Sequence, residues 1–130
     1  MTIVSVDEIR SLENACTSLL EMEQIRHVAV INKLGRMVAG SFKKGVERYL
    51  DEEKVKMVYM QLMLDLRMRQ ELDEILGPID YIASRRKNIM IVSVPTQNYL
   101  IVISAERDAS SSNIVKRAEE LFDIIDFHGK

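Results

Sequence analysis

The sequence predicts an α/β protein of the α+β kind, a five-stranded antiparallel sheet between helices in the order α-β-β-α-β-β-β-α. Apolar residues recur at helical spacing in three segments, which indicates amphipathic helices. Short, branched, apolar runs separated by tight turns indicate strands that pair as hairpins. Both alternating sets of residues in these runs are apolar, so we expect helices on both faces of the sheet.

Length and composition favour one folded domain over residues 1–130, with a tail at 126–130. Hydrophobic residues make up 47% and charged residues 29%, which is typical of a globular protein and not of a disordered chain. The net charge of −2, from 18 basic and 20 acidic residues, provides no overall field that would attract nucleic acid or a membrane. Acidic residues near the start and the absence of a long apolar run favour a cytoplasmic protein without a membrane span.

In the N-terminal part, Ser5 and Glu8 form a capping box that begins a first helix. Cys16 lies within the apolar stripe of this helix, so we expect a buried and unreactive thiol. Residues 26–41 resemble a hairpin, with a turn that ends in Gly35. We expect His27, at the start of its first strand, to face solvent.

A long helical run, Glu52–Leu76, dominates the middle of the sequence. Asp51 is a suitable N-cap, and Gly77 followed by Pro78 ends the helix. The connection before it, residues 42–50, is the longest irregular segment.

At about 100° per residue, this helix carries two apolar stripes on opposite sides. The longer stripe consists of Met57, Met60, Leu64, Met68 and Ile75. The shorter stripe consists of Val55, Val58, Tyr59, Leu62 and Leu66. We assign the longer stripe to the chain's own sheet and the shorter to a partner, because an exposed apolar patch of this size marks interaction sites. Two alternatives stay open: the reverse assignment, since methionine also suits adaptable interfaces, and burial of both stripes in the core.

The C-terminal part predicts three strands, at residues 80–84, 89–94 and 99–105, joined by short turns as an antiparallel meander. A polar cluster at residues 108–112 then begins a final amphipathic helix, whose apolar residues run from Ile114 to Ile125.

The chemistry of the side chains does not favour an enzyme. His27 and His128 have no metal-ligand spacing, and the sequence contains neither a nucleophile elbow nor a phosphate-binding loop. We therefore expect no cofactor. The basic turn Arg85, Arg86 and Lys87 is a candidate contact for an anion or a partner, although a solvated turn that protects a sheet edge is the simpler explanation. No aromatic residues interleave with this turn, so nucleic-acid binding is an unfavoured alternative.

The pattern as a whole resembles the roadblock/dynein light chain family, which has a profilin-like sandwich fold. Residues 28–39 resemble the opening hairpin of that family, with an apolar strand, a polar turn that ends in Gly and a short apolar return. The strands at residues 89–94 and 99–104 also fit. The acidic long helix and the basic turn indicate an outlying, prokaryotic-type member.

The resemblance implies a homodimer in which the long helices pack together and edge strands join two sheets into one. It places Asp80, Tyr81, Ile82 and Ala83 at the interface, beside the shorter stripe. Family members scaffold or regulate small Ras-like GTPases, or act as motor and signalling adaptors, without a bound cofactor. The expected function is therefore a non-enzymatic, dimeric interaction module, with a small GTPase as a possible partner.

Two other functions remain open from the sequence. A small-ligand sensory domain of PAS-like or profilin-like layout would have an apolar cavity beside the sheet. A weak nucleic-acid binder would use the basic turn.

Overall fold

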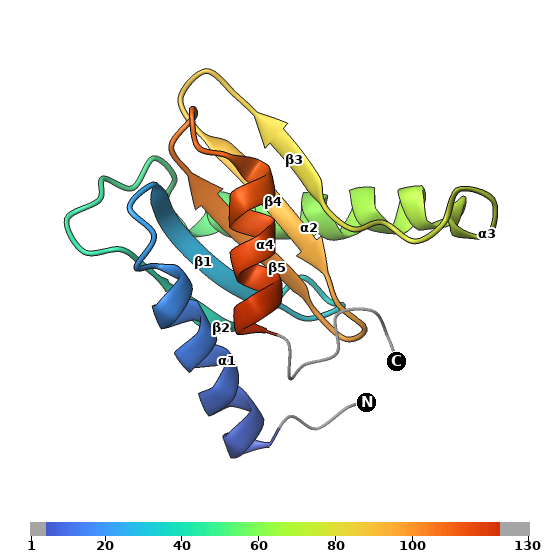
Figure 1. The fold of residues 1–130 in the computed structure, drawn as a ribbon, viewed down its shortest axis with the longest axis horizontal. Coiled ribbons are helices and arrows are strands. Elements are labelled where there is room, and N and C mark those ends of the chain that lie inside the picture. Colours follow the sequence, from blue (N-terminus) through green and yellow to red (C-terminus); the bar gives the residue numbers. More distant parts are fainter. Residues whose placement is uncertain (1–4, 123–130) are drawn as a thin grey trace.

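The computed structural model of this chain describes residues 5–122 and confirms the predicted fold class. Figure 1 shows its elements along the chain. They are α1 (Val6–Leu19), β1 (Ile25–Ile31), β2 (Met37–Phe42), α2 (Glu52–Gln70), α3 (Asp73–Leu76), β3 (Ile82–Arg85), β4 (Met90–Pro95), β5 (Leu100–Ala105) and α4 (Ser111–Leu121).

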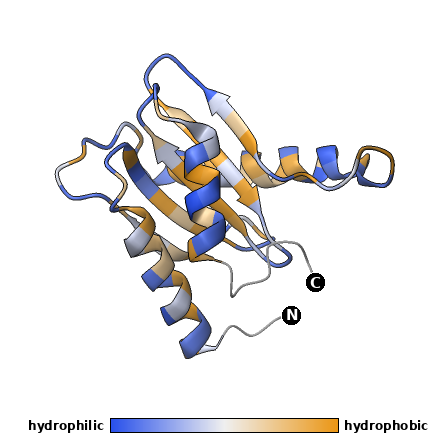
Figure 2. Ribbon diagram, viewed as in Figure 1, coloured by the Kyte–Doolittle hydropathy of each residue, from blue (hydrophilic) through white to orange (hydrophobic). Residues whose placement is uncertain are grey.

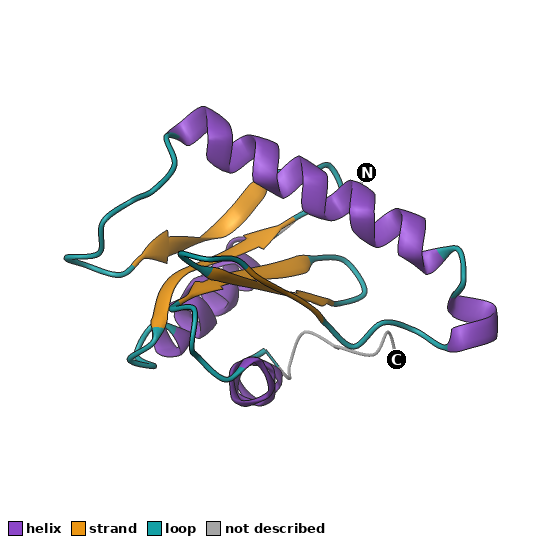
Figure 3. Ribbon diagram, turned by 90° about the horizontal axis from the view of Figure 1, so that it is seen from above, coloured by secondary structure: helices purple, strands orange, loops and turns teal. Residues whose placement is uncertain are grey.

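The five strands form one antiparallel sheet in the order β2-β1-β5-β4-β3. Strands β1 and β5 are central, and β2 and β3 form the two edges. Helices α1 and α4 cover one face, while α2 crosses the other face, as Figure 3 shows. The expectation that helices lie on both faces of the sheet is confirmed.

Each face of the sheet has its own hydrophobic core. The larger core lies under α1 and α4 and contains Leu12, Leu19 and Phe122, which are fully buried. The smaller core lies under α2. Figure 2 shows hydrophobic colouring along the central strands and alternating colours along the helices, in agreement with this layered arrangement. Among residues 5–122, no helix combines the length and the apolar character that crossing a membrane requires.

The helix starts follow the capping chemistry that the sequence predicts. The backbone N–H of Glu8 donates to Oγ of Ser5 at 3.0 Å, and the N–H of Lys54 donates to Asp51 at 2.9 Å. Helix α4 begins after Ser110 and its last residue is Leu121. Ile125, His128 and the tail at 126–130 lie outside the described residues.

The prediction of a single helix over Glu52–Leu76 was wrong in its last part. Helix α2 ends at Gln70, Leu72 leaves helical geometry with φ −101° and ψ 8°, and the short α3 follows. Figures 1 and 3 show that α3 lies beyond the edge of the sheet at β3. No packing against the sheet holds this last turn in line with α2, because Ile75 and Leu76 are almost fully exposed.

The assignment of the longer stripe to the chain's own sheet was also wrong, because the shorter stripe meets the sheet. Tyr59, Met63 and Leu66 are buried, with Val55 and Leu62 packed beside them on the sheet. The longer stripe, from Met57 to Ile75, faces away from the sheet. Helical periodicity identifies both stripes but not which one meets the sheet. In the smaller core, Tyr59, Met63 and Leu66 of α2 pack with residues of the central strands (Ala29, Ile31, Leu100 and Val102).

Candidate interaction sites

The first candidate site is the outward face of α2 and α3, which we call the methionine stripe. Its members are Met57, Met60, Leu64, Met68, Leu72, Ile75 and Leu76. Their exposed fractions lie between 47% and 80%. The members on α2 are three or four residues apart and form one line along its surface, and Leu72, Ile75 and Leu76 continue the exposed apolar surface beyond its end. Soluble proteins rarely leave an apolar surface of this kind without a function.

The turn between β1 and β2 lies against this stripe. A side-chain carbon at Gly35 would come within 2.6 Å of Sδ of Met60, so the turn passes directly beneath that side chain. Arg67 donates from its guanidinium to the carbonyl of Lys33. Two further exposed hydrophobic residues, Leu34 and Met37, belong to this hairpin. The hairpin therefore adds apolar surface beside the stripe.

The second candidate site is the open edge of β3, which pairs only with β4. The N–H of Arg86 donates to the carbonyl of Ile89 at 2.8 Å, so these two residues form a hydrogen-bonded pair. Hydrogen-bonded and non-hydrogen-bonded pairs alternate along an antiparallel ladder. Arg85 and Ala83 are one and three residues before Arg86, so they belong to non-hydrogen-bonded pairs. Their backbone N–H and carbonyl groups therefore point toward the open edge. This edge can accept another strand.

The residues that the sequence analysis placed at the interface do not form one surface. Asp80, Tyr81 and Ala83 are exposed at or just before β3, and Ile82 packs at the margin of the core beneath α2. Of the five helix residues assigned to a partner, four pack against the chain's own sheet: Val55, Tyr59, Leu62 and Leu66. The fifth, Val58, is half-buried and lines a pocket.

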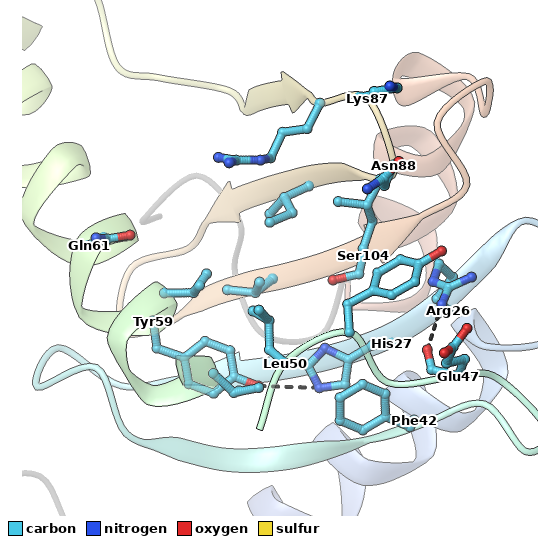
Figure 4. Close-up of a pocket in the computed structure, with 17 residues that line it drawn as sticks. Arg26, His27, Phe42, Glu47, Leu50, Tyr59, Gln61, Lys87, Asn88 and Ser104 are labelled. Carbon is cyan, nitrogen blue, oxygen red and sulfur yellow. Dashed lines mark hydrogen bonds between the residues drawn. The ribbon is translucent and has the colours of Figure 1, made fainter. Parts of the chain in front are cut away.

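The third candidate site is a pocket of about 980 Å³ beside the N-terminal half of α2 (Figure 4). Its floor is the part of the sheet that α2 leaves uncovered. Phe42, His27, Ser104 and Ile91 stand at successive cross-strand positions on β2, β1, β5 and β4. The walls are α2, the connection at residues 43–51 and the turn between β3 and β4. Such a concave site with a mixed apolar and polar lining is typical of ligand pockets.

The prediction that His27 faces solvent was wrong. Its side chain is 5% exposed and stacks on Phe42, with 4.1 Å between the ring centroids. Its Nε2 and the hydroxyl of Tyr59 share a hydrogen bond of 3.2 Å. Burial, and then the nearby Arg48, lower the pKa of His27 to about 4, so the imidazole is neutral at pH 7. Strand alternation could have predicted this burial, because it places His27 on the same face of the sheet as Ala29, which is apolar.

Cation contacts hold the connection at residues 43–51 in place as a wall of the pocket. The guanidinium of Arg26 forms an ion pair with Glu106 at 2.8 Å and donates to the carbonyl of Glu47 at 2.6 Å. It also lies 4.6 Å from the centroid of the Tyr49 ring. The ammonium of Lys43 donates to the carbonyl of Met22 at 2.5 Å. The wall is therefore bound to β1 and to the turn that follows α1.

The basic turn lies at the rim of this pocket. Arg85, Arg86 and Lys87 are exposed, and none of them forms an ion pair with a carboxylate among residues 5–122. Arg86 and Lys87 line the pocket together with Asn88. These two cations are therefore available to an anion or to an acidic partner.

The described residues contain few groups suited to catalysis. Within residues 5–122, no three His, Cys, Asp or Glu side chains cluster closely enough to hold a metal ion. The thiol of Cys16 is buried in the larger core, and burial raises its pKa to about 12. The expectation that this cysteine is buried is confirmed.

Residues 4–130 match the model of a family described as a family of unknown function, DUF6659. No curated protein matches the sequence at a significant level.

Solved structures with the same arrangement of elements are similar over nearly the whole chain. The gliding protein MglB from Thermus thermophilus has a TM-score of 0.75 at 14% identity, covering 97% of this chain and 95% of its own. An MglB structure with a tetrameric arrangement has a TM-score of 0.74 at 14% identity, covering 100% and 97%. The Roadblock/LC7 domain from Streptomyces avermitilis has a TM-score of 0.69 at 8% identity, covering 87% and 92%. The roadblock-like fold that the sequence predicts is therefore confirmed.

Proposed function

This chain belongs to the DUF6659 family, and we propose that it is a non-enzymatic, dimeric protein-interaction module that acts in the cytoplasm. We propose a small Ras-like GTPase as the class of its functional partner. The exposed methionine stripe carries this proposal, because it lies opposite the face of α2 that covers the sheet. The resemblance of the sequence to roadblock proteins, which scaffold or regulate such GTPases, gives the partner class.

The stripe has the properties of a docking surface for another protein. A helix that covers a sheet needs one apolar face, and its outer face is normally polar. Here the outer face keeps large hydrophobic residues along its full length, from Met57 to Ile75. Methionine side chains are flexible and polarisable, so they adapt to a partner surface. Arg67 and Arg69 beside the stripe add charges of the kind found at interface rims.

A second copy of the chain is the partner that we propose for the open edge of β3. Two antiparallel copies of β3 can pair around a twofold axis at Ala83, whose backbone groups point outward. This register sets Asp80 opposite Arg86 of the partner subunit and Tyr81 opposite Arg85 of the partner subunit. An axis at Arg85 would instead bring two like charges together, which disfavours it.

The position of α3 supports the same assembly. Helices α2 and α3 extend past β3, as Figures 1 and 3 show. In a pair joined through β3, this extension reaches over the sheet of the other copy. The exposed Ile75 and Leu76 would then lose contact with water. One of the similar MglB structures has a tetrameric arrangement, which supports the proposal that this chain also assembles with copies of itself.

Affinity capture from native lysate tests the functional partner. The purified chain is used as bait, with either a non-hydrolysable GTP analogue or GDP added. We expect enrichment of a Ras-like GTPase that depends on the nucleotide and is lost when Leu64→Lys and Met68→Lys are combined. Val6→Lys is the matched control, because Val6 is as exposed as Met68 but lies on α1, across the sheet. An unchanged set of captured proteins with the stripe variant would contradict the proposal.

A further inference from the structure

The pocket beside α2 shares only Arg86 with the proposed protein contacts and has the features of a small-molecule site. Its volume of about 980 Å³ is at the upper end of the range for pockets that hold drug-sized ligands. The methionine stripe lies on the opposite side of α2 from the sheet, so the two surfaces are separate.

The apolar part of the pocket is a surface of branched side chains next to a group of rings. Ile91 lies on the floor, Val102 lies at its margin where α2 covers the sheet, and Val55 and Val58 form the side toward α2. At the far end of the floor, the stacked rings of His27 and Phe42 adjoin the wall that contains Tyr49 (Figure 4). Branched aliphatic side chains beside aromatic rings favour a ligand with a planar, apolar body. The rings of such a ligand can stack with an offset, or meet edge to face, with the aromatic side chains.

The charges around the pocket favour an anion. Arg26 is already paired with Glu106, which leaves Arg86 and Lys87 as the cations of the lining and Glu47 as its carboxylate. Arg48 adds a further positive charge, with its guanidinium 4.1 Å from the centroid of the Phe42 ring. This local excess of positive charge stands out on a chain with a net charge of −2.

Neutral polar groups at the pocket can orient a bound molecule. Ser104 rises from the floor, Gln61 projects from α2 and Asn88 from the turn, as Figure 4 shows. The guanidinium of Arg86 has five N–H donors, so contact with one carboxylate in a dimer leaves donors for a second anion.

We propose that this pocket binds a small aromatic anion. Its planar body lies on Ile91 beside Val55 and Val58 of α2, and its carboxylate, sulfonate or phosphate meets Arg86 and Lys87. The geometry of one chain builds the whole site. Binding therefore does not require the dimer or the GTPase contact.

Two dyes that share an apolar body test the proposal. The probe 8-anilinonaphthalene-1-sulfonate carries a negative charge, whereas N-phenyl-1-naphthylamine does not. We expect saturable fluorescence enhancement by the anionic dye at one site per chain. Combining Arg86→Gln with Lys87→Gln should weaken binding of the anionic dye about tenfold, because it removes both exposed cations that would contact the sulfonate. The neutral dye should bind this variant as it binds the unmodified chain.

A pair of tryptophan variants locates the dye on the fold. Val58→Trp fills the pocket and should abolish binding of both dyes. Met57→Trp places the same ring one residue away, on the outward face of α2, and should leave both affinities unchanged. Circular dichroism confirms that each variant is folded before titration. The proposal is overturned if Val58→Trp binds like the unmodified chain, or if Leu64→Gln in the stripe abolishes binding instead.

Discussion

Folding removes the imidazole of His27 from water, and this makes the stability of the protein depend on pH. Its pKa falls from 6.5 to about 4, first because of burial and then because of Arg48. The unfolded chain therefore binds a proton between these two values while the folded chain does not. Stability from this group is fully present above about pH 6.5 and is lost as the pH falls toward 4. The neutral ring keeps the hydrogen bond with Tyr59 and the stack on Phe42.

We predict that His27→Gln removes this part of the pH dependence. A difference of 2.5 pKa units corresponds to about 3 kcal/mol of unfolding free energy between pH 7 and pH 4. Urea unfolding at pH 7, 6, 5 and 4 measures it in both proteins. The carboxylates titrate in both, so their effect cancels in the difference. If both proteins lose the same stability between pH 6.5 and 4, the imidazole is not buried as described.

Among the secondary-structure elements, β3 allows a specific prediction about dimer formation, because its outer edge is open. Ala83→Pro removes one backbone N–H that points away from β4, so the β3–β4 ladder keeps its hydrogen bonds. We expect this variant to shift the chain from dimer to monomer at micromolar concentration. Ala83→Thr is the control, since it keeps the amide and favours strand structure. Light scattering coupled to size exclusion reports the mass against 15.0 kDa for one chain.

Equal masses for Ala83→Pro and Ala83→Thr would contradict pairing through this edge. Thermal unfolding of both variants shows whether β3 still folds onto β4. A proline variant that is less stable than the threonine variant at a concentration where both are monomers would indicate damage within the chain, not loss of a partner.

The sequence predicts the elements well because their signals are local. Caps at Ser5 and Asp51, the Gly35 turn and the apolar strands are all read within a few residues. Contacts between distant segments are not readable in this way. The side of α2 that meets the sheet depends on its packing against residues of distant strands, such as Ala29 and Val102. The break after Gln70 depends on where the sheet ends, so neither follows from helical periodicity.

The candidate sites show the same limit. The basic turn and the stripes are visible in the sequence, but only the structure shows which of their side chains are exposed. The pocket has no sequence signature, because its lining comes from segments as distant as Arg26 and Ser104. Its strongest clue, a histidine in an apolar strand, indicates a buried polar contact only after strand alternation is considered.

At the scale of the whole molecule, the proposed twofold register predicts a particular pair of charges. Asp80 would face Arg86 of the partner subunit, and the symmetry axis at Ala83 repeats this pair. Asp80→Arg alone, or Arg86→Asp alone, replaces both attractions with repulsions. Each exposed pair contributes about 0.5–1 kcal/mol, so we expect the dimer dissociation constant to rise about tenfold in either single variant.

The combined variant, Asp80→Arg with Arg86→Asp, restores opposite charges at both positions and should recover the original dissociation constant within about threefold, given the usual non-additivity of neighbouring changes. Sedimentation equilibrium at about 50 mM salt measures all four proteins, since screening weakens exposed pairs at high salt. Recovery would show that the two residues are neighbours across the axis. In any register that separates them, the two exchanged charges could not attract each other. A double variant as weak as the single variants would exclude the axis at Ala83 while leaving pairing through β3 intact.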